Sequence, residues 1–292
     1  MNYQRMDSSD QRVYKYIFDF GDAVVESVLY RYPDFQTRTV LCISVQSGCP
    51  VGCKFCGAGK HFVRNLTSDE IVSQVKTVFK DQNIEDINEN CEKLQIMFMS
   101  MGEPMLNWDN VEQSIRALNK DYPNADLLIS TVGIRNLDVL KSILKISHEI
   151  NKIGLQISLH KIDERKRNEL IPYNDKLTIL ELREFGSAWA LLTGRNPYLN
   201  ICIEENEPLA YYASKKDLDG LYENMSFYTE GKDECEEIIK VFPGAIFCFT
   251  FSVICNPDST VKESYNNNIE IIKKVSRSEE RRVGKECRYR WS

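Results

Sequence analysis

The chain has 292 residues, of which 42% are hydrophobic, so it is long enough to bury a full-sized core. Its 37 Lys and Arg residues against 43 Asp and Glu residues give a net charge of −6, which argues against a surface that is basic throughout, as in many nucleic-acid-binding proteins. The sequence has no apolar run of bilayer length, and residues 1–11 are polar, so we expect no membrane span, no secretory signal and a cytoplasmic location.

The first predicted elements are β-strands. Val13–Phe20 and Ala23–Tyr30 are rich in β-formers and are separated by Gly21-Asp22, which predicts a hairpin. The apolar, β-branched run Thr39–Gln46 predicts a buried strand. After a loop rich in Gly and Cys, a helix is expected to begin at Thr67 or Ser68, since acidic residues fill its first turn and apolar residues then recur with a helical period.

Strands and helices then alternate along the chain. The expected strands are Leu94–Met101, Asp126–Thr131, Ile153–Leu159, Tyr198–Ile203 and Ala245–Ile254, and the expected helices are Trp108–Leu118, Asn136–Ile146, Thr178–Leu192 and Lys232–Ile239. About six such βα units are too few for a closed eightfold barrel. The pattern therefore predicts an α/β fold, a partial (β/α)6 barrel over residues 39–275, with a β-hairpin extension over residues 1–38.

Three of the ten cysteines lie close together, in the segment GCPVGCKFC that follows the first buried strand. Cys49, Cys53 and Cys56 form a C-x₃-C-x₂-C motif, which suits an iron–sulfur cluster with one iron left without a protein ligand. An open coordination site is typical of a catalytic metal centre. The alternatives are a zinc site or chance clustering, although the second cysteine pair of a zinc ribbon is absent.

This loop resembles the signature of the radical S-adenosylmethionine (SAM) superfamily. The longer string from Cys42 to Ile71, CISVQSGCPVGCKFCGAGKHFVRNLTSDEI, resembles the RlmN/Cfr family, whose members methylate C2 or C8 of an adenosine in large-subunit (23S) rRNA, and in RlmN-type members also tRNA. The resemblance runs from about Ser8 to Asn174 and weakens from there to Pro257. It implies a [4Fe–4S] cluster and SAM as cofactors, an RNA substrate and an electron donor such as flavodoxin or ferredoxin, and we expect a monomer.

The resemblance also marks residues that would contact SAM, each at the end of a predicted strand where barrel enzymes keep their chemistry. They are Gly102 and Glu103 in MGEPMLN, Ser130 in STVG, Ser158, Leu159 and His160 in SLH, and Asn256 before Pro257. Without the family pattern, a strand-end serine is usually a local cap, a lone histidine is more often structural, and Glu103 could simply favour the start of a helix.

Two further residues correspond to positions near the family's reaction centre. Glu26, in VVESVLY, resembles the proposed proton-accepting glutamate, and Cys42 aligns with a cysteine near the reacting atoms. The alternatives are an exposed strand carboxylate for Glu26 and a buried strand thiol for Cys42.

In the mechanism that the resemblance implies, SAM is cleaved to a 5′-deoxyadenosyl radical, and a C-terminal cysteine carries the methyl group. The segment expected around that cysteine is absent from the sequence, and YLNICIEENE, residues 198–207, departs from the family pattern. Residues 276–292 resemble the translation of a sequencing adapter, with a genuine basic tail as the alternative, and the family's N-terminal RNA-binding helical domain is not seen.

From these departures we expect that the chain as given cleaves SAM without methylating RNA. Two rival functions stay open: a radical SAM enzyme acting on a peptide or small molecule, and a non-catalytic metal-binding remnant.

Overall fold

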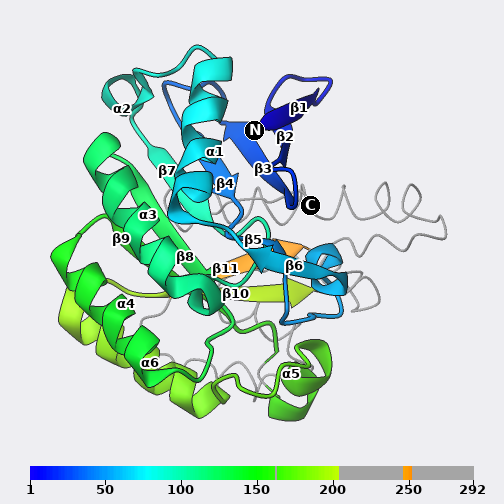
Figure 1. Cartoon of the computed structure of the whole chain (residues 1–292). Coiled ribbons are helices and arrows are strands. Elements are labelled where there is room, and N and C mark those ends of the chain that lie inside the picture. The colour runs from blue at the N-terminus through cyan, green and yellow to red at the C-terminus, as the bar shows by residue number, and fades with distance from the viewer. Residues whose placement is uncertain (162, 204–245, 252–292) are drawn as a thin grey trace, which may run out of the picture.

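The computed structural model describes residues 1–161, 163–203 and 246–251 (Figure 1). Within these residues, nine strands form one mixed sheet in the order β1-β2-β3-β4-β7-β8-β9-β10-β11, and β5 (Gln46–Gly48) and β6 (Phe62–Asn65) form a small second sheet. The order of strands in the main sheet therefore follows their order in the chain.

The N-terminal part of the sheet is antiparallel. β1 (Asn2–Asp7) pairs with β2 (Val13–Asp19), β2 with β3 (Val24–Arg31), and β3 with β4 (Thr39–Ile43). β2 and β3 correspond to the predicted hairpin. β1 was not predicted, because it is polar and exposed along its whole length and so carries no alternating apolar pattern.

Side chains of this N-terminal part are attached to the first long helix, α1 (Ser68–Asp81). The carboxylate of Asp81 accepts hydrogen bonds from the hydroxyls of Tyr3 (2.6 Å) and Tyr16 (2.7 Å) and from Arg5 Nη1 (2.7 Å). Donors on β1 and β2 thus converge on one acceptor at the C-terminal end of the helix.

From β4 onward the strands of the main sheet run parallel. The further parallel strands in the described residues are β7 (Leu94–Phe98), β8 (Asp126–Thr131), β9 (Ile153–Ser158), β10 (Tyr198–Ile203) and β11 (Ile246–Phe251). With β4 they make the six parallel strands of a partial barrel, which confirms the predicted fold class.

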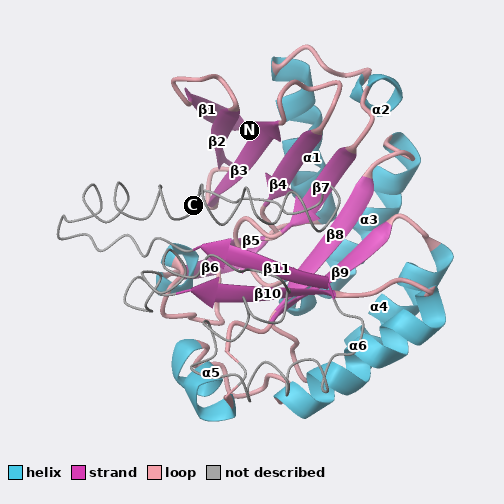
Figure 2. Cartoon of the chain, turned by 180° about the vertical axis from the view of Figure 1, so that it is seen from behind, coloured by secondary structure: helices cyan, strands magenta, loops and turns pink. Residues whose placement is uncertain are grey.

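The long helices α1, α3 (Trp108–Asp121), α4 (Leu137–Glu149) and α6 (Ile179–Thr193) lie on one side of the main sheet (Figures 1 and 2). The described chain also has the short helices α2 (Ile87–Asn90) and α5 (Glu164–Leu170) and the 3₁₀ turns η1 (Gly57–Lys60) and η2 (Pro104–Asn107). α1 begins where predicted, because Thr67 and Glu70 form a capping box in which each side chain bonds the other residue's backbone N–H. None of the helices in the described part of the chain has the length and apolarity to span a bilayer.

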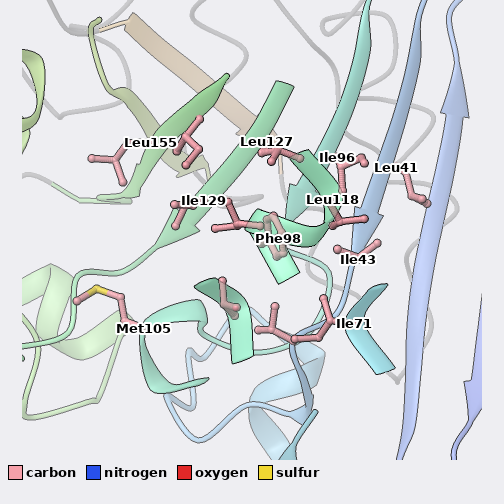
Figure 3. Packing of buried hydrophobic residues seen from close by; sticks show 14 of the residues in the cluster. Leu41, Ile43, Ile71, Ile96, Phe98, Met105, Leu118, Leu127, Ile129 and Leu155 are labelled. Atoms are coloured by element: carbon pink, nitrogen blue, oxygen red, sulfur yellow. The ribbon is translucent and has the colours of Figure 1, made fainter. Parts of the chain in front are cut away.

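The main core lies between these helices and the sheet. Alternate strand residues such as Leu41, Ile96, Leu127 and Leu155 meet helix residues, including Leu118, in this layer (Figure 3). The residues between them point to the other, inner face of the sheet. A smaller apolar cluster lies there, made of Tyr30, Val40, Cys42, Met97 and Leu128.

Candidate functional site

The three cysteines of the motif lie on the loop that follows β5. Gly48 has a φ of +75°, and a Cβ there would lie 1.5 Å from the carbonyl oxygen of His61, so β6 can approach only a glycine at this position. The N–H of Cys56 donates to the carbonyl of Cys53 at 3.0 Å, and the N–H of Lys54 donates to the carbonyl of Leu170 at 2.9 Å. The loop is therefore held both by its own turn and by α5.

Cys49, Cys53 and Cys56 are half-buried free thiols within electrostatic range of one another. Burial raises the pKa of Cys49 to about 12, and Glu103 and Cys56 add to the rise. Burial also raises the pKa of Cys53, with further contributions from Cys56 and Cys49. Cys49 and Cys53 are therefore protonated at neutral pH when no metal is bound, and a metal centre that binds them would displace these two protons.

Among the described residues, no three His, Cys, Asp or Glu side chains are grouped as they would be around one metal ion.

Glu103 joins the ends of two neighbouring strands. It is only 4% exposed, and its carboxylate accepts hydrogen bonds from Met105 N (3.0 Å), Thr131 Oγ1 (2.6 Å) and Val132 N (2.9 Å). Burial raises the pKa of Glu103, and these hydrogen bonds offset part of the rise. A carboxylate has about four acceptor positions, and these three hydrogen bonds occupy three of them.

The backbone around Glu103 is fixed by Gln46. The side-chain oxygen of Gln46 accepts the N–H of Glu103 at 2.8 Å. Gly102, which precedes it, has a φ of +99°, and a Cβ there would lie 2.7 Å from the Cβ of Gln46. The predicted Gly102-Glu103 segment is therefore packed tightly against the start of the small sheet.

Ser130 and Ser158 come together as predicted for residues at the ends of parallel strands. They end the inner faces of β8 and β9, and their hydroxyl oxygens are 3.5 Å apart. Both are largely buried, at 8% and 9% exposure. The pair places two adjacent hydroxyls at the same edge of the sheet as Glu103.

His160 has unusual backbone and side-chain surroundings. Its φ is +62°, a left-handed conformation that is costly for a residue with a side chain. Burial lowers its pKa to about 3, with Arg167 and Lys161 adding to the effect, so the ring is neutral. Its Nδ1 is buried without a hydrogen-bond partner among the described residues, and its ring lies 4.6 Å from that of Phe55 on the cysteine loop. A polar ligand bound beside this loop would supply the hydrogen-bond partner that Nδ1 lacks.

The side chain of Leu159 points into the core, unlike those of its neighbours Ser158 and His160 in the SLH segment. It is fully buried in the core between helices and sheet. Only its backbone could therefore make the predicted contact with SAM. Asn256 lies outside the described residues.

Glu26 and Cys42 share the inner face of the sheet. Cys42 is opposite Val28 in the β3–β4 register, and Glu26 lies two residues from Val28 on the same face. Lys15 Nζ is 2.5 Å from a Glu26 carboxylate oxygen, while Cys42 is buried and its sulfur lies 3.9 Å from that of Met97. The structure thus places both residues on the inner face, and Glu26 lies nearer than Cys42 to the carboxyl ends of the parallel strands.

Three further residues shape the site and were not predicted from the sequence. Gln46 and Thr131 bond Glu103 as described above, and Arg167 is a fully buried cation on α5. No motif marks Arg167, since Arg165 and Lys166 in the same short helix have the same charge. Thr131 could have been noticed because it sits directly beside Ser130 in the STVG segment.

The chain belongs to the radical SAM superfamily, since residues 43–209, more than half of its length, match the family described as "Radical SAM superfamily". The cofactors of this superfamily are a [4Fe–4S] cluster and SAM, as predicted from the motif. The half-buried thiols and the unsatisfied His160 nitrogen fit these two groups.

Curated relatives and a solved structure are also similar to the chain. It is 40% identical over 181 residues to a "Probable dual-specificity RNA methyltransferase RlmN" of Pseudothermotoga lettingae, covering 60% of this chain and 48% of the relative. It is 35% identical over 206 residues to the protein of that name from Dictyoglomus turgidum, covering 68% and 56%. The chain thus spans about half the length of these relatives. The fold matches a radical SAM methyltransferase from Sphaerobacter thermophilus with a TM-score of 0.68 and 24% identity, covering 100% of this chain and 77% of the other.

Proposed function

We propose that this chain is the radical-generating part of an RNA methyltransferase that acts on C2 or C8 of an adenosine in 23S rRNA and also on tRNA. The observation that carries the proposal is the three-cysteine loop beside strand-end polar groups, in a chain 35–40% identical to several relatives named RlmN. The RNA substrate is proposed because these relatives are named as RNA methyltransferases.

In this proposal Cys49, Cys53 and Cys56 are the cluster ligands. Three protein ligands leave one iron free for SAM. With SAM bound, the reduced cluster supplies the 5′-deoxyadenosyl radical. Cys49 and Cys53 pack against the main core, which limits their contact with water.

We propose that the residues predicted from the sequence to contact SAM do so with the groups that lie at the strand ends. Gly102 and Glu103 receive the amino group, using the remaining acceptor capacity of the Glu103 carboxylate. Ser130 and Ser158 offer hydroxyls, Leu159 its backbone, and His160 a neutral ring nitrogen. Asn256 is proposed as a further contact from its motif alone.

Glu26 and Cys42 are proposed to act on the reacting base from the inner face. Glu26 would accept a proton during methylation, and Lys15 holds its carboxylate in position. Cys42 lies deeper in the same face, beside Met97. We propose that Cys42 forms part of the surface, on the inner face of the sheet, against which the reacting base lies.

We also propose partners, a location and a division of the chain. The cluster needs an electron donor of low potential, such as flavodoxin or ferredoxin. We propose a cytoplasmic location, because free thiols are stable in that reducing compartment.

The chain is proposed to act as a monomer. We propose a barrel over residues 39–275 and an N-terminal extension over residues 1–38. Residues 276–292, which lie outside the described residues, are proposed to be a non-native tail.

Anaerobic reconstitution with iron and sulfide tests the cluster. The protein should turn brown and, when reduced, cleave SAM to 5′-deoxyadenosine. Cys53→Ala should abolish both properties, whereas Cys91→Ala, which changes another half-buried free thiol, should keep both. Anaerobically prepared protein that binds zinc and no iron would favour the metal-binding remnant instead.

A chimera tests the RNA substrate. Residues 39–203 of this chain would replace the matching part of an RlmN relative, and nucleosides of rRNA and tRNA would be analysed by mass spectrometry after incubation with SAM and reductant. Methyladenosine is expected, and it should disappear with Cys53→Ala. A chimera that cleaves SAM yet methylates neither RNA would favour a peptide or small-molecule substrate.

A further inference from the structure

Arg167 is a buried cation that the predicted site residues do not include. Its side chain is fully buried, with Nη1 donating to the carbonyl of Leu177 and Nη2 to the carbonyl of Val132, both at 2.8 Å. Its Nε is buried without a hydrogen-bond partner among the described residues. Within these residues, the Nε–H of Arg167 is thus left without an acceptor although Nη1 and Nη2 each donate to a carbonyl.

The helix that carries Arg167 lies against the cysteine loop. The hydrogen bond from Lys54 N to Leu170 O joins α5 to the residue that follows Cys53. Burial lowers the pKa of Arg167, whereas Glu164 and the thiolate form of Cys53 raise it, so both lie within electrostatic range of the guanidinium. Lys176 has the same surroundings: burial and Arg167 lower its pKa, and Glu164 and Cys53 raise it.

Within the described part of the chain, little negative charge balances Arg167 and Lys176. Glu164 is 3.8 Å from Arg167 Nη1, but its side chain is 39% exposed, so solvent screens it, and it also accepts the N–H of Ile179. Arg167 and Lys176 otherwise bond neutral carbonyls. Burying a cation with so little compensation is costly unless another negative group completes the site.

We propose that the positive charge of Arg167, together with that of Lys176, offsets the negative charge of the cluster and raises the reduction potential of the cluster. This inference rests on the proposed function, because it takes Cys49, Cys53 and Cys56 as the ligands. Net charge, hydrogen bonds to sulfur and solvent exposure set the potential of such clusters. Reduction adds one electron, so a nearby cation stabilises the reduced form more than the oxidised form. Arginine suits this role because it stays charged when buried.

Arg195 provides a matched control. It also donates Nη1 and Nη2 to two carbonyls, those of Asn151 and Ser147, and its Nε is likewise buried without a partner in the described part of the chain. It lies just before β10, at the opposite end of the strands from the cysteine loop. Replacing it removes an equivalent clamp without removing charge near the cluster.

The experiment is a reductive titration with dithionite of the anaerobically reconstituted full chain, followed by electron paramagnetic resonance. Arg167→Gln should have a lower reduction potential than the wild type, and Arg195→Gln should match the wild type. An Arg167→Gln protein with an unchanged potential would overturn the inference. A fall of equal size in Arg195→Gln would also overturn it, because the effect would then be structural.

Lys176→Gln covers the case in which Arg167→Gln does not retain a cluster. It should lower the potential in the same direction by a smaller amount, and an unchanged value would overturn the inference. If the wild type itself takes up no iron, the proposed function fails and the inference falls with it. If the wild type takes up a cluster and the potentials of the variants stay the same, the inference alone fails.

Discussion

At the turn after β7, Gly102 meets two constraints that can be separated by mutation. Its φ is +99° and a Cβ would lie 2.7 Å from the Cβ of Gln46, whereas Gly21 has a φ of +97° with no atom within 4 Å of such a Cβ. Gly21→Ala should therefore cost about 1 kcal/mol of backbone strain alone. Gly102→Ala should cost clearly more, as measured by urea unfolding. Equal losses would show that Gln46 moves away without penalty.

The buried carboxyl of Glu103 should make stability depend on pH in a defined direction. Its pKa is raised in the folded state, mainly by burial, above the ordinary value of 4.5. The folded state therefore holds this proton more tightly, and the stability it contributes is full below pH 4.5 and is lost as pH rises through the folded pKa.

Glu103→Gln isolates this effect, because the amide does not titrate. The free energy of unfolding of the wild type minus that of the variant should fall as pH rises from 4.5, when measured by urea unfolding of iron-free protein. A difference that grows with pH would mean that the hydrogen bonds from Thr131, Val132 and Met105 outweigh burial.

At the scale of elements, Asp81 joins the N-terminal strands to α1. A carboxylate at a helix C-terminus is unfavourable, so the donors from Tyr3, Tyr16 and Arg5 must compensate. Although burial raises the pKa of Asp81, these hydrogen bonds lower it overall.

Asp81→Asn should weaken this attachment and raise amide hydrogen exchange in β1 and β2. Exchange in β7 should be unchanged, because that strand is buried in the parallel sheet. Asp121→Asn, which alters an exposed ion pair with Lys76, is the control and should leave all these strands protected. Unchanged exchange in Asp81→Asn would show that strand pairing alone holds the extension.

The long elements of the fold were predictable because their local signals were strong. Asp126–Thr131 and Tyr198–Ile203 match β8 and β10 in full, and α1 begins after its capping box. β1, α2 and α5 were missed, since they are short or lack an apolar face. The predicted strand Ala245–Ile254 contains β11, and the predicted helix Lys232–Ile239 lies outside the described residues.

The site was predictable where a motif identified it and unpredictable where only packing does. The convergence of Ser130 with Ser158 follows from parallel strands that end at one edge. The left-handed conformation of His160 and the full burial of Arg167 depend on contacts far apart in the chain, such as that of Arg167 with Val132. A single sequence holds no local record of such contacts.

For the whole molecule, the cluster should act as a ligand of the folded state. A bound cluster stabilises only the folded protein, because the loop that holds the three cysteines is formed only there. Iron removal by an anaerobic chelator should lower the melting temperature of the wild type. Cys53→Ala should melt near the iron-free value with or without chelator. A wild-type melting temperature indifferent to iron would indicate that the loop binds its metal without coupling to the fold.

The alternation of residues along each parallel strand limits how the gene can change in length. In β8, Leu127 and Ile129 pack beneath the helices, while Leu128 and Ser130 point to the inner face. Deleting or inserting one codon within the strand would exchange these two sets, placing a hydroxyl in the core and an isoleucine beside the cofactors. We therefore expect insertions and deletions to be tolerated only in the connections between the strands.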